Sequence, residues 1–123
     1  MIQTVEMLKA LSETNRLRVV MALTRHAELC ACQITELLQV TGATVSRHLG
    51  ILQHAGLLES RREGRWIHYR LAVPTDGEPL FKWLKSSCAA TDPFETDARE
   101  LDRILGMERE ELCRMQRGEA CCP

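Results

Sequence analysis

The chain has 123 residues, a net charge of −1 and 45% hydrophobic residues. These values suit one compact domain and leave little room for an enzyme with a separate substrate lobe. No uninterrupted apolar run approaches the roughly 18 residues of a membrane-spanning helix, and no charged-then-apolar leader is present. We therefore expect a cytoplasmic protein that does not enter a membrane.

Charge is unevenly distributed along the chain. Residues 41–70 contain five arginines and two glutamates, whereas residues 92–123 contain nine carboxylates and five arginines. A basic surface on an otherwise neutral or acidic protein is typical of a protein that meets phosphate groups on one side only. The distribution therefore keeps nucleic acid among the candidate partners, although the net charge is slightly negative.

The first four elements expected are helices. A short helix covers residues 4–11, and the Ser12 hydroxyl is placed to accept a free backbone N–H at the start of a second helix, whose apolar stripe covers residues 16–25. A third helix is expected from about residue 30 to residue 39, and a fourth over residues 43–55. Two consecutive short helices of this kind predict a helix-turn-helix.

Two glycines mark the end of the fourth helix and the turn of a hairpin behind it. Gly56 is expected to end the helix as a left-handed residue. The extended runs 57–61 and 66–71 are joined by a turn in which Gly64 supplies a positive backbone dihedral. The expected fold is therefore a winged helix-turn-helix, mostly α with a two-stranded β-hairpin.

The C-terminal third is expected to be helical and charged. A fifth helix covers residues 80–88, with an apolar face that belongs to the core or to a dimer interface, and a linker follows over residues 91–96. A charged helix then covers residues 97–115. We therefore divide the chain into a DNA-binding and dimerisation domain, residues 1–90, and a C-terminal helix with a cysteine-containing tail, residues 91–123.

The thiols form the candidate chemical site. Six cysteines are present, and clustered thiols without a secretory leader indicate metal or redox chemistry rather than a disulfide framework. Thiolates select soft ions such as zinc, cadmium, lead and copper(I) and, by the same argument, trivalent arsenic and antimony. Cys88 is expected to pack as a small apolar residue instead.

Cys30 and Cys32 open the third helix. Residues i and i+2 of a helix point to nearly opposite sides, so both thiolates can hold one ion only if the first turn unwinds or if the pair lies at its frayed start. This conflict predicts a switch in which ion binding distorts the helix that supports the DNA-reading helix. The helix N-terminus is also expected to lower the pKa of the thiols.

The order helix, helix, Cys-x-Cys helix, recognition helix, wing and helix resembles the ArsR/SmtB family of bacterial metal-responsive repressors, over roughly residues 5–84. The segments that carry the resemblance are 11–18, 28–32, 45–49, 55–58 and 61–66. It implies a homodimer, not an enzyme, that binds the double-stranded operator of its own resistance operon and leaves it when a thiophilic ion binds. No constitutive cofactor is implied, and arsenite or antimonite is the expected inducer.

The DNA-binding residues are expected on the fourth helix and the wing. A helix of this size fits the major groove, and two such helices about 34 Å apart in a two-fold dimer read a palindrome. The groove-facing candidates are Thr41, Thr44, Ser46, Arg47 and His48. The wing candidates, expected to contact phosphates, are Arg61, Arg62 and Arg65.

The identity of the third thiolate stays open. In arsenic-responsive relatives a third cysteine follows three positions after the second, where this chain has Thr35. The ligands of the cadmium-, lead- and zinc-responsive branches are also incomplete, so the resemblance favours the arsenical branch with a ligand from the tail. The adjacent Cys121 and Cys122 either complete the Cys30 and Cys32 site, bind a trivalent arsenical with Cys113, or act as passive thiol scavengers.

The sequence therefore predicts a transcriptional repressor of a metalloid-resistance operon, released from its operator when trivalent arsenic or antimony binds cysteine thiolates. The alternatives are a thiol-based redox sensor and a cadmium-, lead- or zinc-responsive repressor of the same fold.

Overall fold

The computed structural model describes residues 2–72, 77–88 and 90–115, and it is mostly helical with a small antiparallel sheet. This confirms the expected fold class. In chain order the elements are α1 (Ile2–Leu11), α2 (Thr14–Arg25), β1 (Leu29–Cys30), α3 (Ala31–Leu38), α4 (Gly42–His54), β2 (Leu58–Glu63), β3 (Trp66–Leu71), α5 (Glu78–Cys88), α6 (Phe94–Leu105) and α7 (Arg109–Met115). None of the helices described is long and apolar enough to cross a membrane.

The start of α2 differs from the sequence expectation. Glu13, not Ser12, is the N-cap, and its carboxylate accepts a hydrogen bond of 2.9 Å from the backbone N–H of Arg16. The Ser12 hydroxyl instead donates to the carbonyl of Lys9 at the end of α1. A carboxylate at this position also interacts favourably with the positive end of the helix dipole. Ser12 therefore closes the first helix, and Glu13 opens the second.

The helix-turn-helix consists of α3 and α4. Thr41 caps α4 by accepting a hydrogen bond of 3.2 Å from the backbone N–H of Thr44. Gly56 has a φ of +80°, which confirms the expected left-handed residue after the helix. The apolar stripe of α4 packs into the main core, where Val45, Leu49 and Leu52 are almost completely buried.

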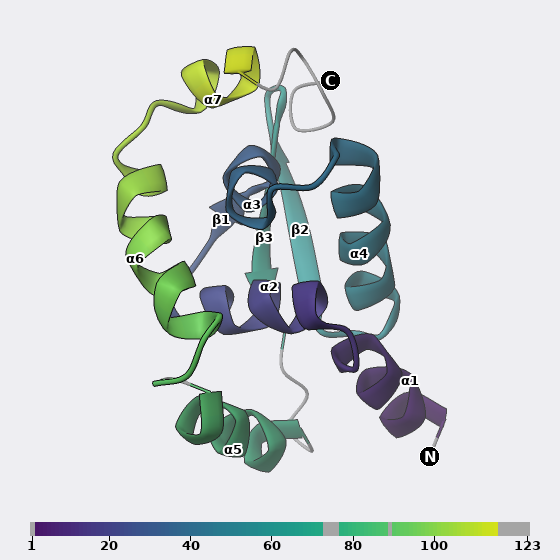
Figure 1. Ribbon diagram of the computed structural model, residues 1–123. Helices are drawn as coiled ribbons and strands as arrows, with labels where there is room; N and C mark the ends of the chain where they lie inside the picture. Colours follow the sequence, from purple (N-terminus) through teal and green to yellow (C-terminus); the bar gives the residue numbers. More distant parts are fainter. Residues whose placement is uncertain (1, 73–76, 89, 116–123) are drawn as a thin grey trace.

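The sheet has three strands in the order β1-β3-β2, one more than the sequence predicted. The hairpin β2–β3 is antiparallel, and Gly64 in its turn has the expected positive φ, +61°. The additional strand, β1, pairs with β3 so that Leu29 lies opposite Tyr69 and Cys30 opposite His68. The wing is therefore joined by backbone pairing to the segment that carries the first thiol (Figure 1).

The C-terminal region forms two helices, not the single helix expected over residues 97–115. The first helix, α6, begins at Phe94 within the expected linker and ends at Leu105, and Gly106 follows as its C-cap. Leu101 and Ile104 are fully buried in the main core, whereas Leu105 is 39% exposed. Figure 1 shows α6 lying alongside α2 and α3, which it contacts.

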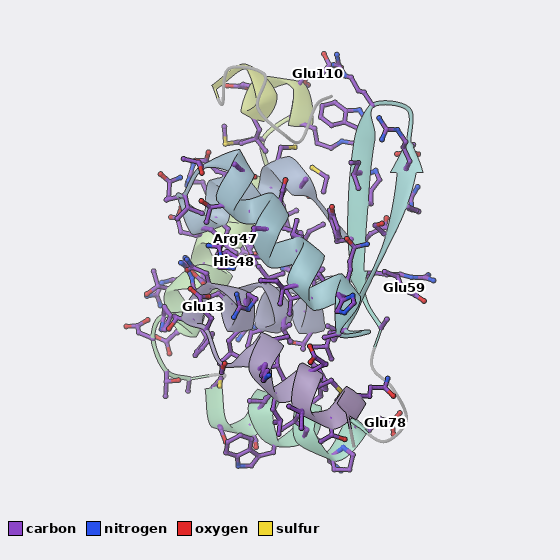
Figure 2. All side chains as sticks on the ribbon, turned by 90° about the vertical axis from the view of Figure 1, so that its right-hand side faces the viewer. Glu13, Arg47, His48, Glu59, Glu78 and Glu110 are labelled. Carbon is purple, nitrogen blue, oxygen red and sulfur yellow. The ribbon has the colours of Figure 1, made fainter. Side chains whose placement is uncertain are left out.

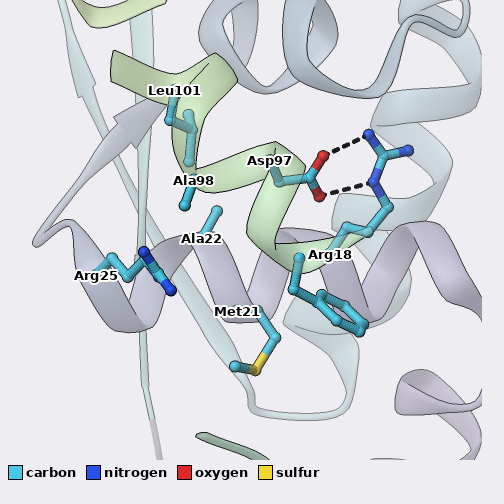
Figure 3. Close-up of a pocket in the computed structure, with 8 residues that line it drawn as sticks. Arg18, Met21, Ala22, Arg25, Asp97, Ala98 and Leu101 are labelled. Atoms are coloured by element: carbon cyan, nitrogen blue, oxygen red, sulfur yellow. Dashed lines mark hydrogen bonds and ion pairs between the residues drawn. The ribbon is translucent and has the colours of Figure 1, made fainter. Parts of the chain in front are cut away.

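An ion pair fixes α6 to α2 (Figure 3). The Arg18 guanidinium of α2 donates two hydrogen bonds, of 2.8 and 2.9 Å, to the two carboxylate oxygens of Asp97. The same guanidinium also donates to the side-chain oxygen of Asn15 and to the backbone carbonyl of Leu37 in the last turn of α3. Residues 94–105 thus pack on the first domain. The boundary near residue 90 stays a prediction.

A second, smaller apolar cluster lies between α2 and α5. It contains Met21, Leu84 and Cys88, all buried. Cys88 therefore packs as a small apolar residue, as the sequence predicted.

Candidate thiol site and nucleic-acid interface

Cys30 and Cys32 are in contact, with their Sγ atoms 2.7 Å apart. Cys30 is the last residue of β1 and the N-cap of α3, with extended dihedrals (φ −84°, ψ 160°), while Cys32 lies in the first helical turn. Because the first thiol precedes the helix, the two side chains converge without any unwinding. The structure therefore corresponds to the second arrangement considered, a pair at the start of the helix, in which a shared ion does not require the first turn to unwind. The switch itself stays a prediction.

Both thiols are enclosed by the core. Cys30 is 1% exposed and Cys32 is 0% exposed, and the backbone N–H of Cys30 donates to the side-chain carbonyl of Gln33. The contact with Cys32, followed by burial, raises the pKa of the Cys30 thiol well above its ordinary value. The expected lowering of this pKa by the helix N-terminus is thus wrong for the ligand-free state. Soft-ion binding must therefore displace the thiol protons.

A third ligand is not evident in the part of the chain that the structure describes. Thr35, where arsenical relatives place a cysteine, is buried, and its hydroxyl donates to the carbonyl of Ala31. Among the described residues, no group of three or more His, Cys, Asp or Glu side chains could hold a metal ion. Cys121 and Cys122 lie outside the described residues, as does the Cys113 side chain, although α7 itself packs against α3.

The recognition helix exposes some of its expected DNA contacts and buries one. Thr41, Ser46 and Arg47 are exposed, and Thr44 is half-buried, with its hydroxyl 2.9 Å from that of Thr41. His48, in contrast, is only 2% exposed, and the expectation that it faces the groove is corrected (Figure 2). The reason is its place one turn after Val45, on the apolar face of α4.

Most wing arginines are paired within the molecule. The guanidinium of Arg61 donates two hydrogen bonds of 2.7 Å to the carboxylate of Glu28, and this interaction lowers the pKa of Glu28. Arg70 pairs in the same strand ladder with Glu59. Arg62 is exposed and has no ion pair with any residue that the structure describes. Arg62 can therefore meet a phosphate without first losing a carboxylate partner.

The wing tip contacts α7. The guanidinium groups of Arg65 and Arg109 lie 4.9 and 5.0 Å from the centre of the Trp66 ring, and Arg65 is 3.8 Å from the carboxylate of Glu110. These cation–π contacts give Arg65 partners that compete with a phosphate. This arrangement could not be predicted from the sequence, because it depends on the bend between α6 and α7.

Sequence reasoning also missed a polar cluster beside the thiols. His68, which pairs with Cys30 across the sheet, is 8% exposed, and its Nε2 lies 3.1 Å from both Glu63 and Arg109. In the sequence, the sign of this cluster is His68, a polar residue in the second strand of the wing. Its position next to the thiols follows from the pairing of β1 with β3.

Comparison with known proteins agrees with this geometry. Residues 13–60, from the cap of α2 into β2, match the family model described as bacterial regulatory protein, arsR family. The solution structure of the homodimeric winged helix-turn-helix DNA-binding domain of Mb0332 from Mycobacterium bovis, a possible ArsR-family transcriptional regulator, is 30% identical, with a TM-score of 0.61. The similarity covers 69% of this chain and 77% of that one. This chain belongs to the arsR family.

Two curated relatives of this family member are named for resistance to different elements. The arsenic resistance transcriptional regulator ArsR1 of Pseudomonas putida is 41% identical over 63 residues, which is 51% of this chain and 49% of that protein. The cadmium resistance regulatory protein CadC of Listeria innocua is 39% identical over 61 residues, 50% of this chain and 51% of that protein. The chain thus spans about half the length of these relatives. Membership in a family of regulatory proteins agrees with the expectation of a regulator, not an enzyme.

Proposed function

We propose that this arsR-family protein is a DNA-binding repressor of a metalloid-resistance operon that leaves its operator when trivalent arsenic or antimony binds Cys30 and Cys32. The observation that carries the proposal is the contact between two buried thiols at the junction of β1 and α3. This junction adjoins both DNA-binding elements, because α3 packs against α4 and β1 pairs with the wing. The name of the relative from Pseudomonas putida supports arsenic as the inducer.

The proposed DNA contacts come from α4 and the wing. Arg47 and Arg62 are exposed, and within the described residues neither forms an ion pair, so we assign them the principal contacts. The secondary contacts are Thr41, Thr44, Ser46, Arg61 and Arg65. Arg61 reaches DNA at the expense of its pair with Glu28.

A homodimer is part of the proposal. The N-terminal helix α1 exposes Val5 (42%) and Leu8 (52%), and α5 exposes Trp83 (61%). Large apolar side chains of this kind are commonly covered by a partner, and the similar Mb0332 domain is homodimeric. A second copy on these helices would leave α4 and the wing of each protomer available for DNA.

Each thiol that binds arsenite loses a proton and forms a bond from its sulfur to arsenic. The proton leaves with an arsenite hydroxyl as water, so two thiols yield two waters and no electron transfer. The Sγ atoms of Cys30 and Cys32 are 2.7 Å apart, which leaves too little room for an arsenic or antimony atom bonded to both, so the two thiols must separate. That separation moves β1 relative to α3. A coupling of about 1–3 kcal/mol is enough to change operator affinity by about 5- to 150-fold.

The third thiolate is proposed to come from the C-terminal region, from Cys113, Cys121 or Cys122. A trivalent arsenic atom bound by two thiolates keeps one hydroxyl that a third thiol can replace. Substituting the three cysteines one at a time with Ser should identify the ligand, because loss of the true third thiolate weakens arsenite binding while Cys30 and Cys32 still respond.

The test is release from promoter DNA of the operon that carries the gene, measured by fluorescence anisotropy in an anaerobic buffer with reductant. Arsenite should release the wild-type protein, and Cys30→Ser and Cys32→Ser should stay bound. Cys88→Ser is the matched control, because Cys88 is buried but belongs to the cluster between α2 and α5. Normal release of the protein lacking both Cys30 and Cys32 thiols would overturn the proposal.

A redox switch is the second candidate, favoured by the same thiol contact. Two thiols this close can form a disulfide when an oxidant such as a peroxide accepts two electrons and two protons leave. Release by peroxide but not by anaerobic arsenite would select this candidate. A parallel titration with cadmium tests the third possibility, suggested by the relative from Listeria innocua.

A further inference from the structure

We propose that His48 is a positioning residue for the recognition helix, and that operator binding requires its imidazole to be neutral. The inference rests on the proposed DNA-binding function. It concerns how α4 is held, and no part of it depends on the thiols. His48 would act through its neighbours in α4, not by touching DNA, because its side chain is only 2% exposed.

One hydrogen bond and one longer polar contact of His48 indicate its protonation state. Its Nδ1 lies 3.2 Å from Nη1 of Arg16, and its Nε2 lies 4.0 Å from a carboxylate oxygen of Glu13. A guanidinium can only donate hydrogen bonds, so Nδ1 must be the acceptor and the single ring proton belongs on Nε2. The geometry therefore requires the neutral Nε2–H tautomer.

Arg16 connects His48 to two other helices. The guanidinium Nε of Arg16 donates to the carbonyl of Ala10 in α1 (2.7 Å), and the backbone N–H of Arg16 donates to Glu13 at the start of α2. Through this one side chain α1, α2 and α4 share a connected set of hydrogen bonds. The contact with His48 is thus an anchor between α4 and the body of the domain.

Fixing His48 also fixes the direction of its neighbours. Successive residues of a helix are rotated by about 100°, so an anchor at one position determines where the adjacent side chains point. Ser46 and Arg47, the two preceding residues, are both exposed. Figure 2 shows Arg47 and His48 on the same part of α4, with Glu13 below them. A rotation of α4 would therefore displace the side chains that are proposed to contact DNA.

Protonation of His48 would remove the anchor. A proton on Nδ1 takes away the acceptor and places a positive ring against the Arg16 guanidinium. The charged groups that act on the ring are Glu13 and Arg16 of α2 and Arg47 of α4, whereas α1 contributes the backbone carbonyl that Arg16 contacts. Burial lowers the pKa of His48, Glu13 opposes that decrease, and the two arginines add to it. The imidazole is accordingly neutral at neutral pH.

The test compares operator affinity at about pH 7.5 and about pH 5.5, at constant salt, for the wild-type chain and three variants. His48→Asn keeps an acceptor close to the position of Nδ1 but cannot be protonated. His48→Leu fills the space without an acceptor. His54→Asn is the matched control, because His54 is exposed on the same helix.

We expect wild-type affinity to fall on acidification as His48 becomes protonated, by up to about tenfold, the effect of one hydrogen bond to a charged group. His48→Asn should bind nearly as well as wild type at the higher pH and lose most of the pH dependence. His48→Leu should bind weakly at both pH values, and His54→Asn should behave like wild type. The inference is overturned if His48→Asn and wild type share one pH profile.

An NMR measurement tests the tautomer without DNA. Long-range ¹H–¹⁵N spectra of the full chain should show His48 protonated on Nε2 alone at about pH 7.5. A proton on Nδ1 would refute the proposed hydrogen bond even if a variant failed to fold. If the wild-type chain binds no operator DNA at either pH, the repressor proposal fails, and the NMR result still decides the hydrogen bond separately.

Discussion

Replacing Asp97 with Asn should reveal how strongly α6 is held to the rest of the domain. Asp97 accepts two hydrogen bonds from Arg18, and the two side chains are 9% and 18% exposed. Asn has nearly the same shape as Asp but carries no charge and offers only one acceptor oxygen. The substitution therefore leaves the Arg18 guanidinium partly buried without its anionic partner.

The structure limits the size of this effect. Breaking a fully buried ion pair by removing one partner costs about 3–5 kcal/mol. Arg18 is not fully buried, and it keeps hydrogen bonds of 2.9 Å to Asn15 and 3.1 Å to the Leu37 carbonyl. We therefore expect Asp97→Asn to lower the free energy of unfolding by about 2–3 kcal/mol. For a chain of this length the melting temperature should fall by about 8–12 °C.

Urea denaturation at one fixed protomer concentration measures the change, since dimer formation makes stability depend on concentration. Asp102→Asn, at an exposed position of the same helix, is the control and should stay within about 0.5 kcal/mol of wild type. The double substitution Arg18→Met with Asp97→Leu should recover much of the loss, because no buried charge is left unpaired. An Asp97→Asn variant as stable as Asp102→Asn would refute this account of α6 docking.

Other substitutions test the core, the backbone and the acid side of the stability profile. Leu101→Ala should cost about 2–5 kcal/mol in urea denaturation because Leu101 is fully buried, whereas Leu105→Ala, at a residue 39% exposed, should cost less than about 1 kcal/mol. No atom would crowd an added Cβ at Gly64 or Gly50, so backbone conformation alone decides their thermal shifts. Gly64→Ala should destabilise by about 1–2 kcal/mol at a φ of +61°, and Gly50→Ala in α4 should stabilise by about 0.5–1 kcal/mol. Burial lowers the folded-state pKa of His48, so its contribution to stability is complete above the unfolded-state pKa of about 6.5 and is lost as the pH falls below that value. In urea titrations, His48→Asn should therefore lose less of its free energy of unfolding on acidification than wild type.

Periodicity and glycine positions predicted most of the winged helix-turn-helix. The apolar repeat of α4 and the positive φ of Gly56 and Gly64 were accessible because each depends on a few neighbouring residues. The strand β1 was not accessible, since two residues are too few to form an alternating pattern. Without β1, the prediction began the third helix at about Cys30, whereas Cys30 is the N-cap and the helix begins at Ala31.

His48 shows where residue type misled the interpretation. The position follows Val45 by three residues and precedes Leu52 by four, so the helical repeat placed it on the buried face of α4. Histidine was instead assigned to the polar face because it can contact DNA. The partners that make its burial possible, Glu13 and Arg16, are more than 30 positions away in the sequence. A polar residue within an apolar stripe therefore indicates a buried hydrogen-bond partner elsewhere in the chain.

If arsenite is the inducer, as proposed, the enclosure of the two thiols also sets the rate at which it can bind. Cys30 and Cys32 are 1% and 0% exposed, so a solute can reach their sulfur atoms only while the surrounding packing is transiently open. In a stopped-flow experiment the rate of arsenite capture should rise with concentration and then reach a plateau equal to the opening rate. At arsenite concentrations that reach this plateau, the delay before transcription begins would depend on the opening rate of the protein and no longer on the arsenite concentration.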